Sequence, residues 1–344
     1  MGSETLLARV GPPSDHEGMR QRTLGSSGPA VSAIGLGCMG FSQGYGAVDD
    51  DESVTAIHTA IDSGTTLFDT AQSYGSGHNE RLLARALRDA GPDVRVATKF
   101  GIVRGENGVY LDAKPERVHE YCDASLARLG REVIDLYYLH RVDPEVPIAE
   151  TIGAMADLVH AGKVRHLGVS EVNPEQLAQA AAVHPIAAVQ FEWSLLWREP
   201  ENDVVPAARE LGVGLVPYSP LGRGLLTATL TSETVAASDF RRNDPRFSGE
   251  NLASNLTRVA ALRALADRLG ITTGQLALAW LLAQGPDVVP IPGSRRAERI
   301  VQNAAAAAIE FDAEDRAELE KIVSAGWAGD RQSFAAHGTS RSDS

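Results

Sequence analysis

Cysteine, positive charge and long apolar runs are all scarce in this 344-residue sequence, and each scarcity excludes a class of protein. The only two cysteines, Cys38 and Cys122, do not make a disulfide framework, which is typical of a reducing compartment. One of the longest apolar runs, 276–283, is far shorter than the roughly 18 residues that cross a bilayer. The first twenty residues also lack the apolar core of a signal peptide. We therefore expect a cytoplasmic protein with no membrane partner.

The charge balance argues against a nucleic-acid partner. Lysine and arginine total 32 against 45 aspartate and glutamate residues, so the net charge is −13 and a polyanion would be repelled. With 43% hydrophobic and 22% charged residues, the composition is that of an ordinary globular protein. We expect a small-molecule ligand, and the composition leaves the oligomeric state open.

The two ends of the chain differ from its middle. Residues 1–18 carry glycine, proline and scattered charge without periodicity, which predicts a flexible N-terminal extension. Residues 326–344 predict a flexible C-terminal tail, although Trp327 and Phe334 leave open whether it folds back over a site. Residues 19–325 are expected to form one domain.

Within that domain, short β-branched and apolar runs alternate with helical stretches of about 10 to 16 residues. Eight such pairs in about 300 residues favour a single closed α/β barrel, the (β/α)8 or TIM barrel, over an open sheet. A β-hairpin around 26–28 is expected before the barrel and an extra helix, 313–324, after it. The predicted strands are 34–37, 66–69, 94–99, 134–139, 164–170, 188–191, 214–218 and 288–291. The predicted helices are 51–63, 80–88, 115–129, 148–161, 174–183, 204–211, 255–284, 295–307 and 313–324.

Polar residues stand where several of these strands end, the place at which (β/α)8 barrels carry out catalysis. Asp69, Tyr74, Lys99 and His140 follow three successive apolar runs. A phenol has a pKa near 10, and a neighbouring ammonium group lowers it, while a histidine can orient a carbonyl oxygen. Singly, Asp69 with Lys99 would be a structural ion pair and His140 a core histidine. Their joint position predicts acid–base chemistry on a carbonyl group.

A series of motifs over about 19–325 resembles the aldo-keto reductase superfamily, in which these motifs occur in the same order. The resemblance extends to its bacterial members and, at Ile291-Pro-Gly-Ser-Arg, to its channel β-subunit branch. It implies that Tyr74 protonates the substrate oxygen while nicotinamide delivers hydride. Lys99, paired with Asp69, would lower the pKa of Tyr74, and His140 would orient the carbonyl. The matching motifs are Gly35-Leu-Gly-Cys-Met-Gly, Phe68-Asp-Thr-Ala-Gln-Ser-Tyr-Gly, Thr98-Lys-Phe-Gly, Ile134-Asp-Leu-Tyr-Tyr-Leu-His, Leu167-Gly-Val-Ser, Val189-Gln-Phe-Glu, Tyr218-Ser-Pro-Leu and Ile291-Pro-Gly-Ser-Arg.

The same resemblance implies a site for NADP. A serine before a helix and two arginines also suit a phosphate on physical grounds, because helix N-termini and guanidinium groups bind anions. Arg295 and Arg299, four residues apart, are expected on one helical face, which predicts NADPH over NADH. Tyr218 matches the residue that stacks on nicotinamide, and Ser170 and Gln190 match those that hold its carboxamide. Leu221, Gly222, Arg223 and Gly224 match the pyrophosphate loop; Ser294, Arg295 and Arg299 match the 2′-phosphate site; and Gln302 and Asn303 match the adenine edge.

Three features depart from the family pattern. Glu171 stands where asparagine is frequent, and a carboxylate cannot donate to a carboxamide. Trp193 replaces a common tyrosine. The loop over about 220–254 is long and charged, so substrate specificity cannot be transferred.

Two further motifs are interpreted as coincidences. Gly35, Gly37 and Gly40 fit a dinucleotide-binding pattern, but no helical pattern opens there. Tyr110 and Lys114 mimic the tyrosine–lysine pair of short-chain dehydrogenases, but a helix is expected to start at Pro115. The remaining histidines lack metal-ligand spacing, so no metal site is expected.

The predicted activity is therefore NADPH-dependent reduction of small aldehydes or ketones. Two alternatives remain at this point. One is a cofactor-sensing regulatory subunit with little turnover, and the other is a dehydrogenase that mainly oxidises an alcohol.

Overall fold

The computed structural model describes residues 19–46, 48–105, 108–230 and 240–331. The predicted N-terminal extension 1–18 and residues 332–344 of the predicted tail, Phe334 included, lie outside this description. Across the described residues, no helix combines the length and apolar character needed to cross a membrane.

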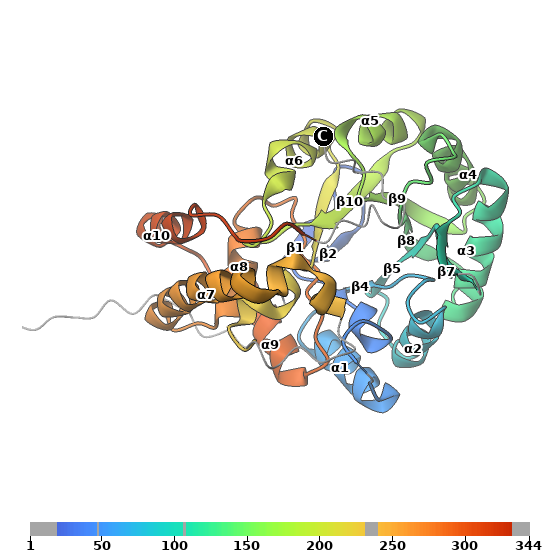
Figure 1. Cartoon of the computed structure of the whole chain (residues 1–344). Helices are drawn as coiled ribbons and strands as arrows, with labels where there is room; N and C mark the ends of the chain where they lie inside the picture. The colour runs from blue at the N-terminus through green and yellow to red at the C-terminus, as the bar shows by residue number, and fades with distance from the viewer. Residues whose placement is uncertain (1–18, 47, 106–107, 231–239, 332–344) are drawn as a thin grey trace, which may run out of the picture.

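A parallel sheet curls into a barrel at the centre of the molecule, and helices surround it (Figure 1). The predicted (β/α)8 architecture is confirmed, because these strands follow one another around the sheet with a helix after most of them. In spatial order the strands are β3 (Leu36–Gly37), β4 (Leu67–Asp69), β5 (Arg95–Phe100), β8 (Ile134–Leu139), β9 (Val164–Ser170), β10 (Ile186–Glu192) and β11 (Gly214–Tyr218).

Residues 287–292 take the place of the eighth strand and close the barrel between β11 and β3. On one side, Val289 and Ile291 donate backbone hydrogen bonds to β11 at 2.8 and 3.0 Å. On the other side, Pro290 and Pro292 accept from Gly35 and Gly37 at 3.0 and 3.2 Å. Proline has no N–H to return, so this edge cannot form a full ladder. The eighth strand is therefore present as an irregular closing segment.

The helices lie outside the sheet, and α10, which packs against α7, is the predicted extra helix (Figure 1). A capping box starts α5, where the side chain of Asn173 accepts from the Gln176 N–H. The helices are α1 (Asp50–Asp62), α2 (His78–Ala86), α3 (Pro115–Leu129), α4 (Ile148–His160), α5 (Pro174–Val183), α6 (Val204–Glu210), α7 (Gly249–Leu269), α8 (Thr273–Leu282), α9 (Ala297–Ala305) and α10 (Ala313–Val323).

Two helix predictions were wrong in their bounds. The single helix expected over 255–284 is divided into α7 and α8, because Gly270 ends α7 at a φ of +70° and Thr272 starts a capping box with Gln275. The helix expected from 295 begins at Ala297, with Arg296 as its N-cap. Arg295 therefore precedes the helix.

A hairpin that the sequence did not predict follows β5. Strands β6 (Ile102–Gly105) and β7 (Gly108–Leu111) pair antiparallel. Tyr110 lies in β7 while Lys114 caps α3, so the two cannot form a tyrosine–lysine pair on a helix. At the other suspected motif, Gly40 lies in a short 3-10 helix and α1 begins only at Asp50. Neither motif therefore has the helix that its pattern requires.

The predicted N-terminal hairpin is also present and plugs one end of the barrel. Strands β1 (Gln21–Thr23) and β2 (Ala30–Ser32) pair antiparallel. Leu24 and Val31 are fully buried and belong to the same apolar cluster as the strand residues Leu67, Ala97 and Val216. The opposite end, where the parallel strands finish, carries the polar residues.

Candidate active site

The four predicted catalytic residues lie at the ends of neighbouring strands. Asp69 is the last residue of β4, Lys99 lies near the end of β5, and His140 directly follows β8. Tyr74 stands in the loop between β4 and α2. The parallel register, with Asp69 opposite Ala97 and Lys99 two residues further along β5, brings the aspartate and lysine side chains together.

Lys99 is the centre of this group and is completely buried. Its Nζ donates to the Asp69 carboxylate, to the Thr70 carbonyl at 2.8 Å and to the Tyr74 hydroxyl at 3.5 Å. The amide nitrogen of Gln190 donates to the other Asp69 oxygen at 2.8 Å. A buried ammonium group is therefore paired and held against a phenol, the arrangement that the strand-end pattern suggested.

The pKa of Tyr74 is shifted in the direction opposite to the one that the sequence predicted. Burial raises the pKa of Tyr74, and Lys99 lowers it by a smaller amount, so the net pKa lies above its ordinary value. The phenol is thus protonated at neutral pH and able to donate. The effect of Lys99 is present, but it offsets burial only in part.

His140 is held neutral. Burial, followed by the positive charges of Arg141, Lys99 and Arg104, places the pKa of His140 well below its ordinary value. Its ring meets the Tyr74 ring edge-on, with the two centroids 5.9 Å apart. Its Nδ1 atom is buried without a hydrogen-bond partner among the described residues. A neutral imidazole beside the phenol can donate one hydrogen bond to a carbonyl oxygen.

One continuous cavity of about 950 Å³ joins this group to the predicted cofactor residues. Two predicted site residues do not line it: Lys99, which lies behind Asp69 and Tyr74, and Gly222. Those that do are Asp69, Tyr74, His140, Ser170, Gln190, Tyr218, Leu221, Arg223, Gly224, Ser294, Arg295, Arg299, Gln302 and Asn303.

The loop after β11 differs in detail from the expectation. Gly222, Arg223 and Gly224 all have positive φ values, of 55°, 55° and 93°. The guanidinium group of Arg223 forms ion pairs with Glu192 at 3.5 Å and Asp244 at 3.2 Å. Arg223 therefore contributes to a buried ion cluster as well as to the cavity wall.

The far end of the cavity carries the arginines predicted for the 2′-phosphate. Arg299 lies in α9 and donates to Gln302 at 3.1 Å. Arg295 precedes α9, so the expectation that the two share a helical face was wrong, and Arg295 donates to the Tyr45 carbonyl at 2.7 Å. Ser294 accepts the Arg296 N–H at 3.2 Å. Ser294, Arg295, Arg296 and Arg299 lie within six consecutive positions, and they line the same cavity as Gln302 and Tyr45.

Sequence reasoning missed several residues that line the cavity, among them Arg141 and Tyr45. Arg141 donates to the Ser170 hydroxyl at 3.2 Å, and its position directly after His140 was a signal that could have found it. The guanidinium group of Arg241 stacks over the Tyr45 ring, with Cζ 5.4 Å from the ring centroid. No local sequence pattern predicted this contact.

Glu171, the first departure from the family pattern, is buried and fully engaged. Its Oε1 accepts from the Glu192 N–H at 3.1 Å and from the Tyr218 hydroxyl at 3.0 Å. Arg331 forms a bidentate pair with it, at 3.1 and 2.5 Å. Burial alone would raise the pKa of Glu171, but Arg331 brings this pKa down to about 2. Trp193, the second departure, packs in the core against Phe191.

This ion pair makes folding stability depend on pH. Because the pKa of Glu171 is lower in the folded chain, its contribution is complete above the ordinary value of 4.5 and declines as pH falls towards 2. The difference corresponds to about 3 kcal/mol. We expect the stability advantage of the natural chain over Glu171→Gln, measured by urea unfolding, to decline as pH is lowered from 5. Glu318→Gln, which removes the carboxylate of an exposed pair with Arg268, is the control. A pH-independent difference would contradict the prediction.

Comparison with known proteins identifies the family and its fold. A model of the Aldo/keto reductase family matches residues 33–324. The chain belongs to this family. Aldo/keto reductases are oxidoreductases that use nicotinamide cofactors, which agrees with a cavity that joins an acid–base group to a cluster of arginines.

Three relatives illustrate how far the likeness extends. The chain is 43% identical over 306 residues to "Probable aldo-keto reductase 1" of Glycine max, covering 88% of each protein. A glycerol dehydrogenase from Gluconobacter oxydans has a TM-score of 0.82 and 30% identity, covering 94% of this chain and 97% of its own. An aldo-keto reductase from Klebsiella pneumoniae in complex with NADPH has a TM-score of 0.69 and 28% identity, covering 89% and 96%.

Proposed function

We propose that this protein reduces aldehyde or ketone carbonyls to alcohols with NADPH, and that Tyr74 donates the proton. The observation that carries the proposal is the buried Lys99, which contacts Asp69 and the Tyr74 hydroxyl beside a neutral His140. A structural ion pair would not need a phenol and an imidazole at the wall of a cavity. Asp69, Tyr74, Lys99 and His140 together contain the groups that donate a proton to a bound carbonyl and orient it.

The residues around the cavity suit NADPH in their chemistry. Tyr218 offers an aromatic ring, and Ser170 and Gln190 offer hydroxyl and amide groups at the end near Tyr74. At the other end, Arg295 and Arg299 offer guanidinium groups for a phosphate. The NADPH complex of the Klebsiella relative supports the same assignment. When bound, the reduced nicotinamide supplies a hydride to the carbonyl carbon.

The chain's own residues handle the proton. The protonated Tyr74 gives its hydrogen to the carbonyl oxygen, and the neutral His140 orients that oxygen by a hydrogen bond. The tyrosinate that remains is stabilised by the ammonium group of Lys99 at 3.5 Å. Asp69 keeps Lys99 in place, and solvent then returns a proton to Tyr74.

A panel of aldehydes and ketones, followed through the loss of NADPH absorbance, tests the function. We expect turnover of several members of the panel. Tight NADPH binding with no turnover anywhere in the panel would favour the regulatory-subunit alternative and contradict the proposal.

The likeness to a glycerol dehydrogenase favours a second candidate, in which the protein mainly oxidises an alcohol. The same residues serve both directions, because Tyr74 accepts in one direction the proton that it donates in the other. Initial rates with NADP plus alcohols and with NADPH plus the matching carbonyls, at one pH, decide between the two directions.

We further infer that residues 19–325 act as one catalytic domain on a small-molecule carbonyl in the cytoplasm. The single barrel over the described residues and the scarcity of cysteine support this inference.

The preference for NADPH should depend on Arg295 and Arg299. The double variant Arg295→Ala/Arg299→Ala should weaken NADPH binding by several kcal/mol, taking roughly 1.5–3 kcal/mol for each charged hydrogen bond. NADH lacks the 2′-phosphate, so its binding should be weakened far less. The measurement is the Kd of each dinucleotide, by quenching of tryptophan fluorescence, for both proteins. Equal losses for NADPH and NADH would mean that the arginines hold the fold, and the NADPH assignment would then be wrong.

A further inference from the structure

The chain that follows α10 returns to the barrel and ends, within the described residues, at Arg331 (Figure 1). We call residues 326–331 the return segment. The side chain of the buried Asn255 in α7 makes two hydrogen bonds with the backbone of Ala328, at 2.8 and 2.9 Å. Gly329 has a φ of +82°, and a Cβ there would lie within 3.0 Å of Pro245 and Arg246 atoms. The segment is thus docked closely enough to place the Arg331 side chain.

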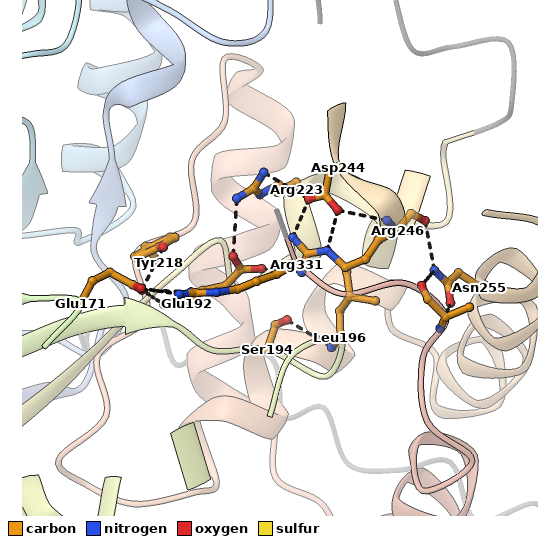
Figure 2. Close-up of polar contacts among 11 residues, drawn as sticks. Glu171, Glu192, Ser194, Leu196, Tyr218, Arg223, Asp244, Arg246, Asn255 and Arg331 are labelled. Atoms are coloured by element: carbon orange, nitrogen blue, oxygen red, sulfur yellow. Dashed lines mark hydrogen bonds and ion pairs between the residues drawn. The ribbon is translucent and has the colours of Figure 1, made fainter. Parts of the chain in front are cut away.

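Arg331 enters a buried cluster of ionised groups (Figure 2). Arg246 contacts Glu192 at 2.6 Å and Asp244 at 2.7 Å, and Arg223 pairs with the same two carboxylates. Within this set, three carboxylates face three guanidinium groups. The cluster consists of Glu171, Glu192, Asp244, Arg223, Arg246 and Arg331.

Within this cluster, Glu171 connects Arg331 to the cavity. Its Oε1 accepts a hydrogen bond from the Tyr218 hydroxyl at 3.0 Å, and both of its oxygens accept hydrogen bonds from Arg331 (Figure 2). Glu171 has a φ of +55°, a left-handed backbone conformation that is uncommon for a glutamate and that the surroundings must maintain. Its acceptor atoms are therefore directed at protein groups, and it is not available to hold a carboxamide.

We propose that Arg331 is a positioning residue for nicotinamide: acting through Glu171, it fixes the hydroxyl, and so the ring, of Tyr218. The inference rests on the proposed function, because it takes Tyr218 as the residue on which nicotinamide lies. The frequent asparagine at position 171 would be replaced here by a relay of two side chains, one of which comes from the far C-terminal end of the fold. Arg331 itself does not line the cavity.

The test compares two ligands that differ only in nicotinamide. The Kd values of NADPH and of 2′-phospho-ADP-ribose are measured by calorimetry for the natural chain, Arg331→Met and Arg331→Lys. We expect Arg331→Met to raise the Kd of NADPH about tenfold, which corresponds to the loss of one hydrogen bond. Binding of 2′-phospho-ADP-ribose should change less than about twofold. Arg331→Lys, which keeps the charge and loses the bidentate geometry, should lie between the two.

Two further variants make the test specific. Arg268→Met removes two ion pairs that join α7 to Asp315 and Glu318 of α10, neither of which is in the Arg331 cluster, and it should alter neither Kd. In a Tyr218→Phe background, Arg331→Met should have no additional effect on NADPH, since the hydroxyl through which it acts is gone. If Arg331→Met does not fold because Glu171 is left as an unpaired buried charge, Glu171→Gln/Arg331→Met takes its place.

The outcomes separate this inference from the proposed function. Equal weakening of NADPH and 2′-phospho-ADP-ribose, or a full effect of Arg331→Met in the Tyr218→Phe background, overturns the positioning role and leaves the reductase proposal standing. No binding of NADPH by the natural chain overturns both. A loss confined to NADPH and abolished by Tyr218→Phe supports the relay.

Discussion

Replacement of Tyr74 by phenylalanine should lower kcat about 10²- to 10⁴-fold, the usual contribution of general acid catalysis. The ring stays and only the hydroxyl is removed, so the cavity keeps its shape. The Kd of NADPH should therefore remain close to that of the natural chain. Steady-state turnover of the best carbonyl in the panel, together with NADPH binding, measures both quantities.

Tyr121→Phe is the matched control for this experiment. Its hydroxyl donates to Asp112 at 2.5 Å, and Tyr121 does not line the cavity. It should leave kcat unchanged. A Tyr74→Phe enzyme that retained half of the natural activity would rule out Tyr74 as the proton donor.

Replacement of Lys99 by methionine should reduce both activity and stability. Asp69 would remain as a buried charge without its cation, which typically costs about 3–5 kcal/mol. The pKa of Tyr74 would rise further, because Lys99 lowers it more than any other group does. Reduction needs the protonated phenol, so the basic limb of the pH–rate profile should move to higher pH. The measurements are urea unfolding and kcat as a function of pH.

A second variant separates the two effects of Lys99. Asp69→Asn/Lys99→Met removes the isolated charge, so stability should largely return while kcat stays low. Asp69→Asn alone should be milder than Lys99→Met, because the ammonium group remains near Tyr74. If Lys99→Met lost stability and kept its kcat, the Asp69–Lys99 pair would be structural only.

The barrel was predictable because its signal is local and repeated. Each buried parallel strand gives a short apolar run, and polar residues that follow such runs must meet at one end of a barrel. Asp69, Lys99 and His140 could therefore be brought together without coordinates. The division of α7 from α8 was missed because apolar periodicity continues across Gly270, which could equally have been an interior glycine.

Contacts between distant segments were not predictable in the same way. Glu171 was recognised as unusual, but its partner Arg331 lies 160 positions away in a segment interpreted as a tail. The contact of Arg295 with Tyr45, 250 positions apart, was missed for the same reason. Charge, burial and orientation decide such pairings, and one-dimensional patterns do not encode them.

The closing segment 287–292 gives the barrel one irregular seam, because Pro290 and Pro292 have no N–H to donate towards β3. Among the described residues, backbone hydrogen bonds from Gly35 and Gly37 join this segment to the β3 side, whereas β5, β8 and β9 share continuous ladders. Local opening along this seam breaks few hydrogen bonds. We therefore expect the amide protons of Gly35 and Gly37 to exchange with solvent faster than those of the longer ladders. The seam leads directly into Ser294 and Arg295. We therefore expect local opening at the seam to affect the arginine end of the cavity before it affects the longer ladder that carries Lys99.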